Sequence, residues 1–312
     1  MIERPDVDAL MAGPLGTWLA EQAQVRAAAR EKSNGRFTIA AVVLLPLFGF
    51  LWFLPVLDMD LKMFGTIGLG ALAGGWAYAP RARAIKQTKE GINRAIADAL
   101  GLAYVHDCQS GHGFDLASRY GMFPRFHRSS FEDSWSGEVA GLPFMLHEAH
   151  LQQRRQSGKN THYVTVFRGA VVSIGARRRF HSTTLVERAG RHKRLFGGAK
   201  DSVEFDGHRL DIVDMVDPAF GDSFAVYPDD QVEARVIVHP AYVERLLEVE
   251  RAYGGEDVRA IFSGGELVVV VESGNLFESG SLDASQDRML VDRTIDQFAS
   301  LTELAGLLNE AR

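Results

Sequence analysis

A run of 21 residues without a charged side chain most constrains what this chain can fold into. Residues 37–57 read FTIAAVVLLPLFGFLWFLPVL. At about 1.5 Å per residue, a helix of this length is roughly 31 Å long, which matches the hydrocarbon core of a bilayer. We therefore interpret the run as a transmembrane helix. Pro46 and Pro55 are expected to kink or end it, which membrane helices tolerate when neighbouring groups satisfy the freed carbonyls.

A second uncharged run follows at residues 63–79 and reads MFGTIGLGALAGGWAYA. With 17 residues it is at the short end of the range for a spanning helix. Trp52, Trp76 and Tyr78 lie near the ends of the two runs, where aromatic residues gather at membrane interfaces. The two runs predict a transmembrane helical hairpin. The alternatives are a re-entrant hairpin that does not cross the membrane and apolar helices in the core of a soluble protein.

Basic residues flank this pair of runs and predict its orientation. Arg26, Arg30, Lys32 and Arg36 precede it, and Arg81, Arg83, Lys86, Lys89 and Arg94 follow it. The segment between the runs, residues 58–62, has one Lys and two Asp. Because basic residues at the ends of spans stay in the cytoplasm, both termini are expected there. The first run begins after residue 36 and is too long for a secretion signal. Cys108 is alone, so no disulfide within the chain is expected.

Three regions follow from these patterns. Residues 1–36 are expected to contain a cytoplasmic juxtamembrane helix, over about 7–30, which lies on the interface or runs into the first span. Residues 37–79 form the two-helix transmembrane hairpin, and residues 80–312 form one soluble cytoplasmic domain. Apolar residues at helical spacing predict that residues 81–100 continue as a helix, with Gly101 as its end.

The soluble region has the pattern of an α+β fold, with one mainly antiparallel β-sheet and flanking helices. Alternating residues predict a hairpin at 135–151 that turns at Ala140-Gly141, and another at 260–273 that turns at Gly264-Gly265. Further strands are predicted at 161–175, 185–188, 202–205 and 223–227. Helices come late, at about 231–252 with a break at Pro240 and at about 284–310. Strands segregated from helices favour α+β over a parallel α/β sheet.

Charge is distributed unevenly. Residues 1–200 hold 26 Lys and Arg against 16 Asp and Glu, whereas residues 201–312 hold 8 against 24. The candidates for a surface that faces anionic lipid are Arg177, Arg178, Arg179, Arg191, Lys193 and Arg194. The alternative is a solvated basic loop between strands. Nucleic-acid binding is not expected, because the cluster has no interleaved aromatic residues.

No motif predicts a reaction or a cofactor. The chain has no phosphate-binding loop, dinucleotide fingerprint or nucleophile elbow, so no catalytic residue is assigned. His147 and His150 are three residues apart in a predicted strand, which places them on opposite faces, so no metal site is expected. The candidates for a polar pocket are Glu132, Arg168, Glu233 and Arg235. The alternative for such Arg and Glu residues is a structural ion pair.

Gly70 and Gly74 form a GxxxG pair in the second run. Small residues let helices approach closely, so this pair is expected to pack on the first span or between copies of the chain. The expected partners are therefore the lipid bilayer and a protein partner or second copy.

Three stretches carry a family resemblance. They are SSFEDSWSGEVAGLPFMLHEAHL at 129–151, VFRG at 166–169 and DPAFGDSFAVYPDDQVEARVIVHPAYVERLL at 217–247, followed by LFE at 276–278. Together they resemble a bacterial family described only as domain of unknown function 3137, over roughly residues 80–305. The resemblance implies a membrane-anchored layout in the bacterial inner membrane, and the family has no established activity that it could imply for this chain.

The patterns favour a membrane-tethered interaction or adaptor module. The alternative is an enzyme of unrecognised type that acts on a membrane-associated substrate, which requires the candidate pocket residues to meet in one cavity. A third hypothesis, a subunit of a larger membrane complex, depends on the glycine-rich second run.

Overall fold

The computed structural model describes residues 4–55, 57–158, 160–191, 201–205, 207–213, 223–255 and 257–310. The chain divides into two compact units. The hairpin unit comprises Asp6–Asn93 and Ser279–Asp292. The sheet unit comprises Met1–Pro5, Arg94–Glu278 and Arg293–Arg312. We describe each unit by itself.

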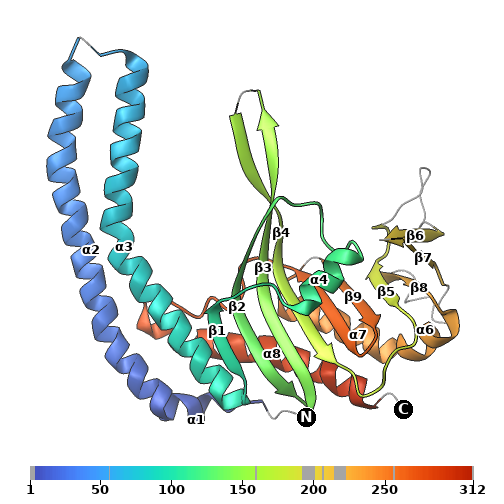
Figure 1. Ribbon diagram of the computed structural model, residues 1–312. Coiled ribbons are helices and arrows are strands. Elements are labelled where there is room, and N and C mark those ends of the chain that lie inside the picture. The colour runs from blue at the N-terminus through green and yellow to red at the C-terminus, as the bar shows by residue number, and fades with distance from the viewer. Residues whose placement is uncertain are drawn as a thin grey trace. The chain divides into compact units, whose positions relative to one another are not determined.

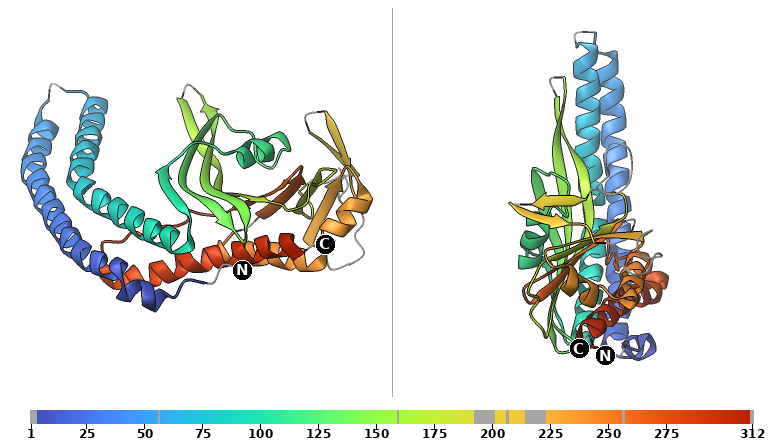
Figure 2. Two further views of the ribbon diagram at one scale, coloured as in Figure 1. Left: turned by 60° about the horizontal axis from the view of Figure 1, so that its bottom comes forward. Right: turned by 90° about the vertical axis from the view of Figure 1, so that its right-hand side faces the viewer.

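Two long helices dominate the hairpin unit. They are α2 (Pro14–Phe53) and α3 (Met59–Leu100), which run side by side in both views (Figures 1 and 2). A short helix, α1 (Val7–Ala12), precedes them, and the 3₁₀ turn η1 (Ala284–Gln286) and the start of α8 (Asp287–Glu310) complete the unit. The predicted juxtamembrane helix runs directly into the first apolar run. Pro46 lies inside α2 and does not end it, whereas Pro55 follows its end.

The sheet unit has an eight-stranded antiparallel sheet in the order β1-β2-β3-β4-β10-β9-β5-β8. The bounds are β1 Ala103–Asp107, β2 Arg128–Val139, β3 Leu142–Ser157, β4 Asn160–Gly175, β5 Thr184–Arg188, β8 Phe224–Pro228, β9 Asp257–Ser263 and β10 Glu266–Glu272. A separate two-stranded sheet pairs β6 (Ser202–Phe205) with β7 (His208–Asp211). The helices are α4 (His112–Arg119), α6 (Gln231–Ile237), α7 (Pro240–Ala252) and the later part of α8. The α+β prediction is confirmed.

Helices cover both faces of this sheet (Figure 2). On one face, Phe114 of α4 belongs to a buried cluster with Val268 and Val270 of β10. On the other face, Tyr242 of α7 lies 5.0 Å from Phe262 between ring centroids. The ring centroids of Trp135 in β2 and Phe298 in α8 are 4.3 Å apart. Because alternate residues of a strand point to opposite faces, continuously apolar strands such as β10 can be buried on both.

Turn residues account for the connections that the sequence predicted. Ala140 and Gly141 have φ values of 53° and 73°, and Gly264 has 61°, as tight hairpin turns require. The predicted late helix is split into α6 and α7, and α7 begins at Pro240. The sequence analysis missed β1, α4 and β7. It also ended the strand before Gly158 at residue 151, whereas β3 continues to Ser157.

Candidate functional site

The hairpin unit carries a band of exposed apolar side chains. Nine large hydrophobic residues of the first apolar run and nine between Met59 and Tyr78 are exposed, against six in the rest of the described chain. The most apolar stretch of α2 has a mean hydropathy of 1.9 and none of it is buried. By length and hydropathy, α2 is a candidate membrane span, and among the described helices no other meets both conditions. The second run is less apolar because glycine replaces larger side chains in it.

Cations and aromatic rings lie at both ends of this band. Arg36 donates to the carbonyl of Trp76 at 2.9 Å, and its guanidinium lies 4.8 Å from the centroid of that ring. Arg81 donates to Oδ1 of Asn34 at 2.5 Å. At the opposite end, Lys62 donates to the carbonyl of Trp52 at 3.3 Å. Such pairs are typical of the water-facing ends of membrane helices.

Gly70 and Gly74 have no neighbouring atoms on the side where a side chain would lie. A Cβ atom added at either glycine would meet nothing within 4 Å, and the same holds for Gly65, Gly68 and Gly75. The contact between α2 and α3 is closer at the base of the hairpin, where Ser33 Oγ donates to the carbonyl of Ala77 at 2.8 Å. Gly91 is by contrast closely packed, because an added Cβ would overlap the ring of Trp18.

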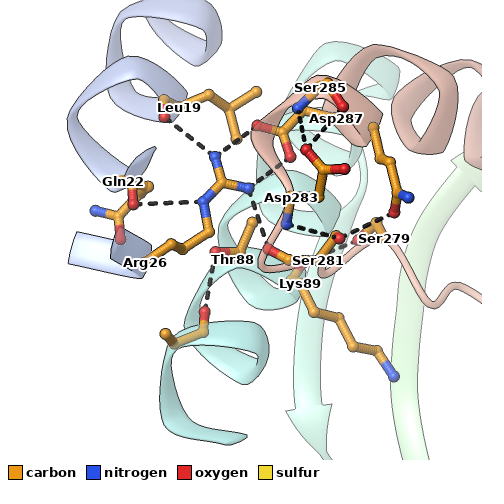
Figure 3. A network of polar contacts seen from close by, with 12 residues as sticks. Leu19, Gln22, Arg26, Thr88, Lys89, Ser279, Ser281, Asp283, Ser285 and Asp287 are labelled. Atoms are coloured by element: carbon orange, nitrogen blue, oxygen red, sulfur yellow. Dashed lines mark hydrogen bonds and ion pairs between the residues drawn. The ribbon is translucent and has the colours of Figure 1, made fainter. Parts of the chain in front are cut away.

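A buried ion pair organises the base of the hairpin unit (Figure 3). Arg26 of α2 forms a bidentate pair with Asp287, with both contacts at 2.6 Å. The side chains are 1% and 4% exposed. Arg26 also donates to the carbonyls of Leu19 and Ser281. The pair therefore joins the first long helix to the segment that begins α8.

Three of the candidate lipid-facing residues lie in the loop after β4. Arg177, Arg178 and Arg179 are exposed, and Arg178 Nη2 lies 3.5 Å from Glu233 Oε1. Hydrogen bonds from Ala176 and Phe180 to the β9–β10 turn hold this loop against the end of the sheet. Lys193 and Arg194 lie outside the described residues.

Arg191 has a different environment. It lies 3.1 Å from Oε1 of Glu187 and 3.0 Å from Oδ2 of Asp257, and its side chain is 20% exposed. Burial and the neighbouring charge of Arg259 lower the pKa of Arg191. Arg191 is thus part of an ion network at the end of β5, rather than of a free basic surface.

Two of the candidate pocket residues share one face of the sheet. His150 is the cross-strand partner of Arg168. Glu132 is two pairs further along β2 and therefore lies on the same face. Arg168 donates to Asn275, and His150 Nε2 lies 2.8 Å from Oγ1 of Thr165. Burial and then the charge of Arg168 lower the pKa of His150, while Glu132 opposes them. These residues form a polar surface of mixed charge.

The other two candidate pocket residues lie on α6. The carboxylate of Glu233 accepts hydrogen bonds from the backbone of His181 at 3.1 Å and of Ser182 at 2.8 Å, and from the Ser182 hydroxyl at 2.7 Å. Burial alone would raise the pKa of Glu233, but these hydrogen bonds lower it below its usual value. Arg235 is exposed. Glu233 therefore fixes the loop before β5.

The sequence analysis missed a buried polar centre at a bulge in β2. The pairing of β2 with β3 shifts between Glu132 and Trp135. Asp133, within this bulge, is fully buried and has a φ of 53°. It accepts a hydrogen bond from the Tyr104 hydroxyl at 2.5 Å and lies 2.8 Å from Nδ1 of His106. The residue pattern gave no signal of this centre, because a bulge changes which face a strand residue occupies.

Cys108 lies beside this centre. Burial, followed by the charges of Asp133 and three other acidic residues, raises the pKa of the Cys108 thiol to about 11. The thiolate is the reactive form of cysteine, so this environment suppresses nucleophilic reactivity at neutral pH.

An open groove of about 410 Å³ lies at the end of the sheet that contains the β9–β10 turn. Its lining includes Pro143, Phe144, Met145, Ser173, Gly175 and Glu266, and none of the four candidate pocket residues. The Glu266 carboxylate contacts Ser173 Oγ at 2.7 Å and His112 Nδ1 at 2.6 Å. The groove therefore holds a single carboxylate that is already paired.

His147 is buried two residues beyond Met145, against the rings of Phe114 and Phe131. Burial lowers its pKa to about 4. Its partner in the sequence pattern, His150, lies on the opposite face of β3. Among the described residues, no group of three or more His, Cys, Asp or Glu side chains is arranged to hold a metal ion.

Comparison with known proteins finds a match to one family model. A family model described as a protein of unknown function (DUF3137) matches residues 165–310. The match covers a little under half of the chain. The resemblance found in the sequence is confirmed for this part, and residues 80–164 lie outside the match. The DUF3137 match begins within β4 and contains the later strands of the sheet and helices α6 to α8.

No curated protein matches the sequence significantly. Among solved structures, the mycobacterial trehalose monomycolate transport factor A (TtfA) is similar at 10% identity and a TM-score of 0.36. The match covers 71% of this chain and 94% of the mycobacterial one. Similarity at this level supports no conclusion about the function of this chain.

Proposed function

We propose that this chain is a membrane-tethered interaction module. Both α2 and α3 cross the bacterial inner membrane, both termini are cytoplasmic, and the sheet unit turns a basic surface toward anionic lipid. The observation that carries the proposal is the band of exposed apolar side chains on both helices of the hairpin unit. Exposed apolar patches of this extent on a soluble protein are rare, and they mark surfaces that another phase or molecule covers.

The exposure on α3 supports a second span despite its lower hydropathy. Leu72 is 74% exposed, Phe64 75% and Ile67 64%. Each square ångström of such surface removed from water contributes about 25 cal/mol, so a bilayer would stabilise α3 as it does α2. The glycines between these residues reduce the mean hydropathy without adding a polar group.

Basic residues support the cytoplasmic orientation. Arg36 and Arg81 lie at the end of the band that leads into the rest of the chain, and Asp58 and Asp60 lie at the other end. The positive-inside rule then assigns the turn between α2 and α3 to the outer side. On the domain, the exposed Arg177, Arg178 and Arg179 would each contribute about 1 kcal/mol near an anionic surface.

Membrane integration of the full chain tests the proposal. The wild-type protein should stay in the membrane fraction after extraction with urea or alkaline carbonate. Leu72→Lys should weaken this retention, because a lysine at the centre of a span costs about 3 kcal/mol. Val236→Lys, which replaces another exposed apolar residue outside the band, should leave retention unchanged. Complete release of the wild-type chain by urea would contradict the proposal.

One observation favours a second candidate function, an enzyme that acts on a membrane-associated substrate. The buried carboxylate of Asp133 contacts the imidazole of His106. The backbone of Asp133 has a φ of 53°, which non-glycine residues rarely adopt. Backbone strain and carboxylate–imidazole pairs are both common where protons are transferred. Incubation of the full chain with labelled membrane lipids should then give a product that Asp133→Asn abolishes. If the wild-type chain gives no product, this candidate is rejected.

A further inference from the structure

The hairpin of β3 and β4 extends beyond the sheet as a free two-stranded ribbon (Figure 1). Pairing of β2 with β3 ends at the pair Arg128 and Gln152, and pairing of β10 with β4 ends at Gly169. Beyond Gln152 and Thr165, the two strands pair only with each other, as far as Ser157 and Asn160. At about 3.4 Å per residue, this free part is roughly 17 Å long. It therefore projects well clear of the rest of the sheet unit.

The ribbon is basic and has no acidic side chain. No Asp or Glu occurs between residues 149 and 186. Arg154 and Arg155 lie on the ribbon, and Arg125 and Arg128 lie at its base. All four are exposed, and none of them forms an ion pair among the described residues. We call the ribbon at 152–165 and these basal arginines the basic arm.

The base of the basic arm is fixed to the sheet. The backbone of His127 donates to the carbonyl of Gln152 at 2.8 Å, and the backbone of Arg154 donates to Nδ1 of His127 at 3.3 Å. These contacts hold the segment that carries Arg125 and Arg128 against the start of the ribbon. The four arginines are therefore presented by connected backbone rather than by separate loops.

Cations occupy both faces of the ribbon. Arg154 is paired across the strands with Tyr163, and Arg155 with His162, so the two arginines point to opposite faces. The remaining positions are mainly Gln, Thr, Ser and Asn. This composition does not suit burial in hydrocarbon or in a protein core. It suits a layer of phosphate groups that can surround the ribbon on both faces.

We propose that the basic arm docks among the phosphate groups of anionic lipids. The proposal deepens the proposed function and rests on it, because the anchor in the same chain keeps a membrane surface within reach of the arm. Arginine is well suited to this role, since its planar guanidinium donates two parallel hydrogen bonds to a phosphate. The arm lies at the opposite end of β4 from Arg177, Arg178 and Arg179, so the two basic surfaces can be tested separately.

The test uses the full chain in nanodiscs. A Cys108→Ser background receives Thr161→Cys, an exposed position near the tip, for a fluorophore whose emission is quenched by spin-labelled lipid headgroups. Quenching should be strong in discs that contain phosphatidylglycerol, weak in discs of phosphatidylcholine alone, and lost in high salt. Each basic residue near an anionic surface changes partitioning about fivefold. Arg154→Gln with Arg155→Gln should therefore reduce the ratio of docked to free arm roughly thirtyfold.

Arg209→Gln with Arg251→Gln, which removes two exposed arginines outside both basic surfaces, is the matched control and should leave quenching at residue 161 unchanged. A label on Arg179→Cys then separates the two proposals. Quenching at 179 without quenching at 161 overturns the role of the arm and leaves the proposed function standing. Absence of lipid-dependent quenching at both positions overturns the role of the arm and also the lipid-facing surface of the sheet unit, whereas the membrane anchor is tested by extraction. Binding of the arm to an oligonucleotide in preference to anionic lipid, measured by anisotropy of the same label, also overturns the role proposed here.

Discussion

Arg26 and Asp287 lie 261 positions apart in the chain and form a bidentate pair that is almost completely buried. A guanidinium and a carboxylate removed from water depend on each other, because either one alone would be a buried, uncompensated charge. The pair links α2 to the residues that begin α8, so its loss would act on the base of the hairpin unit. The sequence contains no local sign of the pair, since Arg26 reads simply as one of several basic residues beside an apolar run.

Arg26→Met should destabilise the hairpin unit by about 3–5 kcal/mol, because it leaves the buried Asp287 carboxylate without a partner. Arg30→Met, which removes an exposed arginine from the same helix, is the matched control and should change stability little. The double variant Arg26→Met with Asp287→Leu should recover most of the loss. Chemical unfolding of the full chain in detergent, followed by circular dichroism, measures all three. Equal stability of the Arg26 and Arg30 variants would refute this account.

His147 should make the sheet unit sensitive to acid. Its pKa is about 4 when folded and about 6.5 when unfolded, so the unfolded chain binds more protons between these values. Stability should therefore fall as pH falls from about 6.5 to 4, by roughly 3 kcal/mol from this residue. His147→Leu should remove that part of the acid sensitivity, whereas His162→Gln, which replaces an exposed histidine, should not.

Nuclear magnetic resonance gives the direct readout for this histidine. A titration should place the pKa of His147 near 4. A pKa above 6 for His147 would show that water or a polar group reaches the ring.

At the scale of elements, local patterns predicted the hairpins and the long helices, because turn glycines and apolar periodicity depend only on neighbours in sequence. The break between α6 and α7 at Pro240 is of this kind. Patterns did not reveal α4, whose eight residues are too few to show a clear period, or the free ribbon, whose residues alternate between polar types. The bulge at Asp133 was equally hidden, since its cause is tertiary.

Glycines in α3 should respond differently to substitution by position. Gly91→Ala should loosen the packing of α3 on α2, because the added methyl group would overlap the ring of Trp18. Gly74→Ala should stabilise α3 slightly, by up to about 1 kcal/mol, since alanine favours helix and the site is open. Thermal unfolding of the two variants in detergent compares them directly. Strong destabilisation by Gly74→Ala would instead mean that a second copy of the chain packs at this position.

At the scale of the whole molecule, the two units differ in the kind of surface that they expose. The hairpin unit exposes a band of large apolar side chains, whose contact with water is unfavourable. The sheet unit buries its strands on both faces and exposes charged side chains. The sequence predicted a helical hairpin at residues 37–79 and a separate domain at 80–312, whereas the hairpin unit also contains residues 80–93 and Ser279–Asp292. The sequence did not predict which charged residues form ion pairs, because a pair such as that of Arg191 with Asp257 depends on contacts between distant segments.

The most direct test of the central claim is the accessibility of single cysteines in intact spheroplasts to a maleimide that cannot cross membranes. In a Cys108→Ser background, Asp58→Cys reports on the turn between α2 and α3, and Thr161→Cys reports on the sheet unit. The account predicts that residue 58 is labelled at once and that residue 161 is labelled only after the membrane is permeabilised. Labelling of residue 161 in intact spheroplasts, or protection of residue 58 there, would contradict it.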